Sequence, residues 1–266
     1  MATTKPEATP ETPKTTAVVT WKDRMAAVAA QAAQTEAPKG GFLSFKGGNI
    51  SYDDNPIPGN KLEVIVTDFL LENSMFREKY NPNKPASPMC YAFGRDEADM
   101  KPHPECEEPQ HPQCGIPGEE GCCPNNEWGS DPDGGRGKAC KNSRRIALIT
   151  TDCLGHEDSA TRVKKANTVM CKIPLTSIKN FSSYVNQCAK VLDVHPFAVV
   201  TELSTKPHPT SLFQVHWKVM DTVKAGDDVM QALYEKHVAT GKLLNQPYPK
   251  QEEEAAPAPK GKSTKY

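Results

Sequence analysis

The chain has 266 residues, of which 37% are hydrophobic, and its 32 Lys and Arg are balanced by 33 Asp and Glu. A net charge near zero excludes attraction of nucleic acid by the chain as a whole, so such binding would need a local cluster of cations. No apolar run of about 18 residues could span a membrane, and residues 1–16 do not have the apolar segment of a secretory signal. We therefore expect a cytoplasmic protein, in which nine cysteines are more often metal ligands or free thiols than disulfides.

Both ends of the chain are poor in bulky apolar residues. Residues 1–40 are rich in Ala, Thr and Pro, and residues 25–33 within them have high helix propensity. Residues 246–266 carry an acidic triplet at 252–254. Neither end can bury enough apolar surface to offset the entropy of ordering it, so we expect two disordered tails around one core domain of residues 41–245.

Alternating apolar and polar residues, many of them β-branched, predict a core rich in strands. A glycine pair at 47–48 predicts the turn of a first hairpin over 42–52. Residues 177–192 instead have their apolar residues on one helical face and predict a helix. A closing helix is expected at residues 227–240, with Gly241 as its C-cap. The other strands are expected at residues 62–71, 89–93, 145–150, 168–173, 197–203 and 212–219.

The expected fold is mainly β with two helices, in the α+β class. Its order of several strands, one helix and two more strands is similar to the OB-fold, a five-stranded barrel with its helix after the third strand. One extra short strand and a long insertion at residues 95–142 depart from that plan. We therefore expect an OB-like barrel with an inserted metal-binding loop.

The insertion concentrates potential metal ligands in a segment rich in Gly and Pro and poor in apolar residues. Such a segment cannot form a core of its own. A structural zinc ion would replace that core, because the free energy of metal binding becomes free energy of folding. Four thiolates, or three and an imidazole, complete a tetrahedral structural site, so the sequence predicts one structural Zn²⁺ here.

The favoured zinc ligands are four cysteines, Cys90, Cys114, Cys123 and Cys140. Cys90 lies on the strand that enters the loop, while Cys123 and Cys140 lie at turns marked by Pro and Gly. The spacing contains no paired C-x-x-C motifs, so three further residues stay open as alternates: Cys106, His111 and Cys122.

The alternative interpretation of the loop is a flexible surface segment with free thiols. A catalytic zinc is disfavoured, because the pairing of H-x-E with P-C-x-x-C found in zinc deaminases is absent. No nucleophile–base–orienter set or phosphate-binding loop is visible either, so we do not expect an enzyme. The remaining cysteines are expected in the core, since their surroundings are apolar: Cys153, Cys171 and Cys188.

Five cations fall close together without an intervening acid: Arg136, Lys138, Lys141, Arg144 and Arg145. They lead directly into a predicted strand, where they would contact a phosphate backbone. Tyr91, on the second strand, and Trp128, in the loop, are the aromatic residues predicted to stack on bases. The alternatives are a solvated charged surface and ordinary core aromatics.

Three segments, CYAFG (90–94), CPNNEWGS (123–130) and GRGKACKNSRR (135–145), resemble a largely uncharacterised family of tailed-phage proteins. The resemblance covers about residues 42–225. In plan the chain is also similar to the single-stranded DNA-binding proteins of T-even phages, which place a zinc subdomain within an OB-fold and carry an acidic C-terminal tail. The chain departs from those proteins in its ligand spacing and in its basic ending, KGKSTKY.

These observations favour a phage single-stranded DNA-binding protein that acts in replication or recombination without covalent chemistry. Its expected partners are single-stranded nucleic acid and, through the C-terminal tail, replication proteins, with no membrane. Its expected location is the cytoplasm of an infected bacterial host. The alternative is a zinc-stabilised protein-interaction module, a phage factor that docks on a host protein, which the near-neutral net charge favours.

Overall fold

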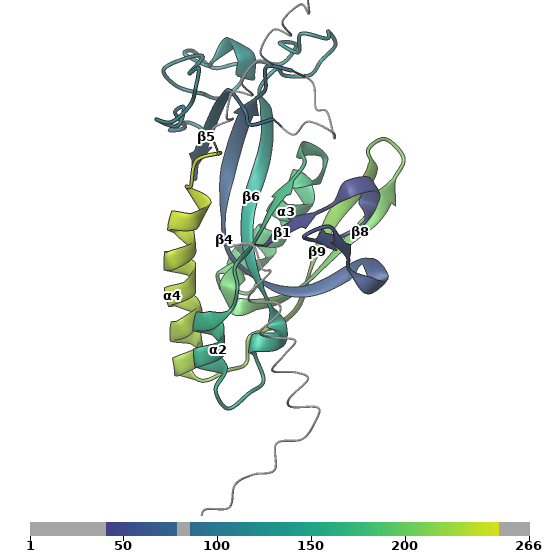
Figure 1. Cartoon of the computed structure of the whole chain (residues 1–266), viewed down its shortest axis with the longest axis vertical. Helices are drawn as coiled ribbons and strands as arrows, with labels where there is room; N and C mark the ends of the chain where they lie inside the picture. Colours follow the sequence, from purple (N-terminus) through teal and green to yellow (C-terminus); the bar gives the residue numbers. More distant parts are fainter. Residues whose placement is uncertain (1–40, 79–85, 250–266) are drawn as a thin grey trace, which may run out of the picture. The chain divides into compact units, whose positions relative to one another are not determined.

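The computed structural model describes residues 41–78 and 86–249. The helix expected over residues 25–33 and the tail beyond residue 249 lie outside this part of the chain. Within the described residues the chain is mainly β, with nine strands and three α-helices (Figure 1). The strands are β1 (Phe42–Ser44), β2 (Ser51–Tyr52), β3 (Asn55–Pro56), β4 (Lys61–Met75), β5 (Cys90–Gly94), β6 (Lys141–Thr150), β7 (Val169–Ile173), β8 (Val199–His208) and β9 (Leu212–Thr222). The helices are α2 (Ser159–Lys165), α3 (Leu175–Lys190) and α4 (Asp227–Leu244).

The strands form one curled sheet in the order β3-β2-β1-β7-β6-β4-β8-β9, and β5 pairs with β4. Strand β4 pairs with β6 along most of its length. On its other side it pairs with β8 near its start and with β5 near its end. All the pairings between described strands are antiparallel except that of β1 with β7. Strand β4 therefore lies inside the sheet and connects three other strands, β5, β6 and β8.

A β-bulge in β4 accompanies this change of partner. Val66 pairs with Leu148 and Asp68 pairs with Ala147, so Thr67 is an extra residue on β4. Its hydroxyl donates a 3.0 Å hydrogen bond to the Ala147 carbonyl oxygen. Because a bulge bends a strand and increases its twist, it helps the sheet to curl around its core.

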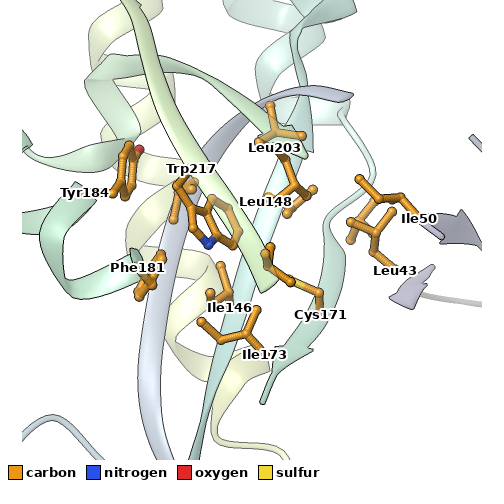
Figure 2. Close-up of a cluster of buried hydrophobic side chains, with 14 of the residues drawn as sticks. Leu43, Ile50, Ile146, Leu148, Cys171, Ile173, Phe181, Tyr184, Leu203 and Trp217 are labelled. Carbon is orange, nitrogen blue, oxygen red and sulfur yellow. The ribbon is translucent and has the colours of Figure 1, made fainter. Parts of the chain in front are cut away.

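The main core fills the concave side of the curled sheet. Alternate residues of β6, Ile146 and Leu148, point into it, as the two-residue period of a strand requires. Helix α3 covers this side with Phe181 and Tyr184, which lie beside Trp217 of β9 (Figure 2). Each such buried side chain contributes about 1.5–3 kcal/mol to folding. This face therefore provides much of the apolar burial that holds the sheet to α3.

A second core lies on the outer face of the two central strands. Ile65 of β4 and Ile149 of β6 pack with Val163 of α2 and with Val229 and Leu233 of α4. Helix α4 runs along β4 (Figure 1). The central strands are thus buried on both faces, which explains their nearly continuous apolar sequence.

The expected α+β class and the expected strands are confirmed, although most bounds differ by a few residues and β3 was not predicted. Three further features differ from expectation. Helix α4 passes through Gly241 and ends at Leu244, whose side chain in the last turn is buried against Leu70 and Ala147. Helix α2 was not predicted, because it is short and mostly polar. Residues 246–249 were assigned to the tail, yet Tyr248 packs against the sheet. None of the described helices is both long and apolar enough to cross a bilayer.

Candidate functional site

The cysteine loop folds over the Met75 end of β4, away from α2 (Figure 1). Cys90 begins β5 opposite Met75, and Lys141 begins β6 opposite Ser74, so Cys90 and Cys140 flank the same end of β4. A small apolar cluster of Ala92, Met100 and Cys114 anchors the loop. The sheet therefore holds both ends of a segment that has almost no core of its own.

The four favoured zinc ligands form one group of thiols. Burial is the main reason why the pKa of Cys140 is raised to about 12, and the charges of three neighbouring thiols add to it: Cys114, Cys90 and Cys123. Burial likewise raises the pKa of Cys114 to about 11, and Cys90 and Cys123 again act on it. All nine cysteines are free thiols. The fold thus brings together cysteines that lie up to 50 positions apart in the sequence, Cys90 and Cys140.

The three alternates differ in the contacts that they make with this group of four cysteines. The Cys106 sulfur accepts a 3.1 Å hydrogen bond from the Tyr91 backbone N–H and adds to the charges that raise the pKa of Cys90. The Cys122 thiol donates to the Cys114 carbonyl oxygen at 3.4 Å. His111 Nδ1 lies 2.9 Å from the Gln113 carbonyl oxygen. Two alternates therefore each interact with two favoured ligands: Cys106 with Cys90 and Cys114, and Cys122 with Cys114 and Cys123.

The cysteine group is looser than a metal-closed site. In the described part of the chain, the group with all ligand atoms within 4.8 Å of one another is Asp68, His195 and His237, not a set of cysteines. A tetrahedral zinc–thiolate site has its sulfurs about 3.8 Å apart, as Zn–S bonds of about 2.3 Å require. The thiols would therefore have to close around a metal. The Asp68 group already has a cation, since Arg95 contacts both carboxylate oxygens of Asp68 at 3.0 and 2.6 Å.

A buried ammonium lies beside the thiols. Lys138 is 8% exposed, donates to Asn126 Oδ1 at 3.2 Å, and lies 4.7 Å from the centre of the Trp128 ring. Burial lowers the pKa of Lys138, and the charge of Cys140 is the largest opposing influence. Lys138 in turn lowers the pKa of Cys140, but this is the smallest of the influences on that thiol, and burial outweighs it. Lys138 is thus an interior residue rather than a surface phosphate ligand.

The other predicted phosphate ligands have different surroundings. Arg144 lies 3.7 Å from Glu97 and its side chain is mostly buried. Arg145 donates at 2.8 Å to the carbonyl oxygens of Leu244 and Gln246, so it holds the C-terminal segment. Lys141 is exposed and pairs with Asp131 at 2.7 Å, and Arg136 is exposed. Of the five cations, these last two are the ones whose side chains face solvent.

The two residues predicted to stack on bases differ in their exposure to solvent. Tyr91 is 3% exposed, because His103 stacks on it at 5.2 Å and Tyr248 meets it edge-on at 5.1 Å. Its ring is therefore not open to a base. Trp128 is 61% exposed, and it is the large aromatic residue that the loop presents to solvent.

Trp128 forms one wall of a groove between the cysteine loop and the start of α3. Two cavities of about 280 and 310 Å³ make up this groove, and both are lined by Trp128, Lys138, Asn142 and Leu175. Asn73 and Asn126 also line the first cavity. Sequence reasoning missed all three asparagines, because no local pattern marks side chains that come together from three segments.

Comparisons of the chain with protein-family models, curated proteins and solved structures found no match.

Proposed function

We propose that the chain is a single-stranded DNA-binding protein built on an OB-like barrel. The order of its long strands carries this proposal. Strands β4, β6 and β7 form a meander, α3 follows, β8 returns to pair with β4, and β9 pairs with β8. Apart from β5, this order is similar to the Greek-key order of an OB-fold, whose helix follows the third strand. On this assignment the cysteine loop occupies the connection between the first and second barrel strands.

That position has a functional meaning in OB-folds. The connections between strands one and two and between strands four and five, with the face of strands two and three, bind oligonucleotides. Here α4 and Tyr248 occupy part of the outer face of β4 and β6. We therefore assign DNA binding to the groove beside the cysteine loop rather than to an open sheet face.

A structural zinc ion is part of the proposal. Cys90, Cys114, Cys123 and Cys140 would hold it, and the ion would supply the folding free energy that an apolar-poor loop does not have. Two observations support this ligand set. The thiols raise one another's pKa values, and the buried ammonium of Lys138 adjoins Cys140.

Electrostatic attraction would come from the rim of the groove. Arg136 and Lys141 are exposed, and Lys141 lines one of the two cavities together with Trp128. A few such cations bind a phosphate backbone even when the net charge is near zero. This arrangement suits a protein of phage DNA replication or recombination that covers exposed strands.

Binding of labelled single-stranded and duplex DNA at two salt concentrations tests the proposal. We expect tighter binding to the single strand and weaker binding at the higher salt concentration. Equal or no binding to the two forms at low salt would favour the second candidate, a zinc-stabilised protein-interaction module. One observation favours that candidate: Arg144 and Arg145 are engaged within the fold rather than displayed.

A further inference from the structure

Rings and cations from three strands form one patch on the outer face of the sheet. Tyr91 and Phe93 of β5 have ring centres 5.3 Å apart, and the guanidinium of Arg145 on β6 lies 4.2 Å from the centre of the Phe93 ring. Lys172 of β7 lies beside Arg145, because the two residues are partners in the pairing of β6 with β7. We call these four residues the platform.

The ring of Tyr248 covers the platform. It meets Tyr91 edge-on at 5.1 Å and lies 6.2 Å from Phe93. The cationic groups of Arg145 and Lys172 lie 5.1 and 6.0 Å from its centre. Aromatic rings and Arg side chains are the groups on which single-stranded nucleic acids stack their bases. Tyr248 therefore occupies a place that suits an unpaired base.

The segment that carries Tyr248 is held mainly by side chains. Residues 246–249 follow α4 and run toward β5 without regular secondary structure (Figure 1), and all of them except Tyr248 are exposed. The prolines on either side of Tyr248 have no N–H to donate to a strand edge. Instead the Tyr248 hydroxyl bonds to Glu72, and the Ser87 hydroxyl donates to the Pro249 carbonyl oxygen at 2.6 Å. The segment can therefore leave the sheet without unfolding a strand.

Arg145 links this segment to the platform. Its guanidinium donates at 2.8 Å to the carbonyl oxygens of Leu244 and Gln246. Departure of the segment would free the donor that now bonds to Gln246, while Lys172 would stay paired with the buried carboxylate of Glu72 at 2.8 Å. A guanidinium is well suited to bind a phosphate. The same movement would thus uncover a ring and free a cation.

We propose that residues 246–249 form a strap over a second site for an unpaired base, and that single-stranded nucleic acid binds the platform once Tyr248 has left it. The proposal rests on the proposed function and adds its regulation. The groove beside the cysteine loop is open, whereas the platform is available only in the molecules whose strap has opened. Because apparent affinity falls with the fraction of binding-competent molecules, the closed strap weakens binding.

Tyr248→Ala tests the strap. We expect the variant to bind a labelled oligothymidylate of about 12 nucleotides, a length within the site sizes of OB-folds, at least about fivefold more tightly than the native chain, because the platform is then uncovered in every molecule. The measurement is fluorescence anisotropy at low salt, below the melting temperature of each variant. A tyrosine with a structural role alone would lower stability without tightening binding.

Three further variants separate the strap from other effects. Val229→Ala truncates a buried side chain of α4 in the cluster of Ile65 and Ile149, so it should lower the melting temperature and leave binding unchanged. Tyr234→Ala removes an exposed ring of α4 and should change neither. Tyr248→Phe keeps the covering ring but breaks the bond to Glu72, so it should tighten binding by a smaller factor and serves if the alanine variant does not fold.

Hydrogen exchange in the native chain tests the strap without a substitution. We expect the amides of Gln246 and Tyr248 to exchange faster once the oligothymidylate is bound. Equal or weaker binding by the folded Tyr248 variants, or exchange that does not quicken, would overturn the strap and leave the proposed function standing. No binding by the native chain or the variants at low salt would overturn both.

Discussion

The hydroxyl of Tyr248 donates a hydrogen bond to the carboxylate of Glu72, a side chain of β4 that is fully buried. Lys172 Nζ lies 2.8 Å from the same carboxylate, and Arg145 contacts the Tyr248 ring. Burial and the charge of Glu72 raise the pKa of Tyr248, so its hydroxyl remains a donor. Tyr248 thus satisfies a buried carboxylate whose charge Lys172 and Arg145 balance, and it fixes the otherwise exposed segment 246–249 to the sheet.

Tyr248→Phe tests this relationship. The variant keeps the ring but removes a donor to a buried carboxylate, so we expect a loss of about 1–3 kcal/mol in the free energy of unfolding. Denaturant unfolding measures it. Tyr234→Phe, which changes an exposed hydroxyl-bearing ring, is the control and should leave stability within experimental error. Equal stability of Tyr248→Phe and the native chain would contradict the core role.

Zinc content is the second prediction. We expect about one equivalent of zinc per chain by metal analysis, and Cys140→Ser should release it and lower the melting temperature. Cys153→Ser changes a buried cysteine that packs with α2 and α4, so the zinc content of that variant should not change. A metal-free native protein whose cysteines all react with thiol reagents would contradict the site.

Proton release should accompany metal binding. In the metal-free protein, burial raises the pKa values of Cys90 and Cys114 to about 11 and that of Cys140 to about 12, so these thiols are protonated near neutral pH. Zinc binds thiolates, so each ligand must lose its proton. We expect zinc addition in weak buffer to release protons, read with a pH indicator, and zinc affinity to fall as pH falls. Affinity independent of pH would exclude thiolate ligands.

Salt dependence separates the surface cations from the interior ones. Replacing Arg136 and Lys141 with Gln should make the log–log salt slope of single-strand binding shallower by about 1.4, at roughly 0.7 per phosphate contact. The same change at Arg162 and Lys165, on α2 away from the loop (Figure 1), should leave the slope unchanged. An unchanged slope after the first pair of replacements would show that these cations do not contact the backbone.

Acid sensitivity is expected from His195. Burial, with a smaller contribution from His237, lowers the pKa of His195 to about 4, below the value of about 6.5 in an unfolded chain. The unfolded chain therefore binds a proton between pH 6.5 and 4 that the folded chain excludes, so stability falls as pH drops through that window. His195→Asn keeps an acceptor for the Phe197 N–H and should reduce this part of the pH dependence, as measured by denaturant unfolding at several pH values.

The sequence by itself determined every described strand except β3, the two long helices and the position of the cysteine loop. Alternation and turn residues are local signals, and a ligand-rich segment without apolar residues is visible in composition alone. The same local signals misplaced the end of α4, because the last turn beyond Gly241 packs Leu244 against Leu70 and Ala147, which lie far away in the sequence.

Only the tertiary structure decided which side chains are available. The two-residue period puts Tyr91 and Phe93 on one face, but it does not reveal that His103 and Tyr248 cover that face. Nor does the run of cations at 136–145 reveal which of them find partners inside the fold. Burial and hydrogen bonding depend on contacts between residues far apart in the chain, such as Glu72 with Tyr248, and the fold sets these contacts.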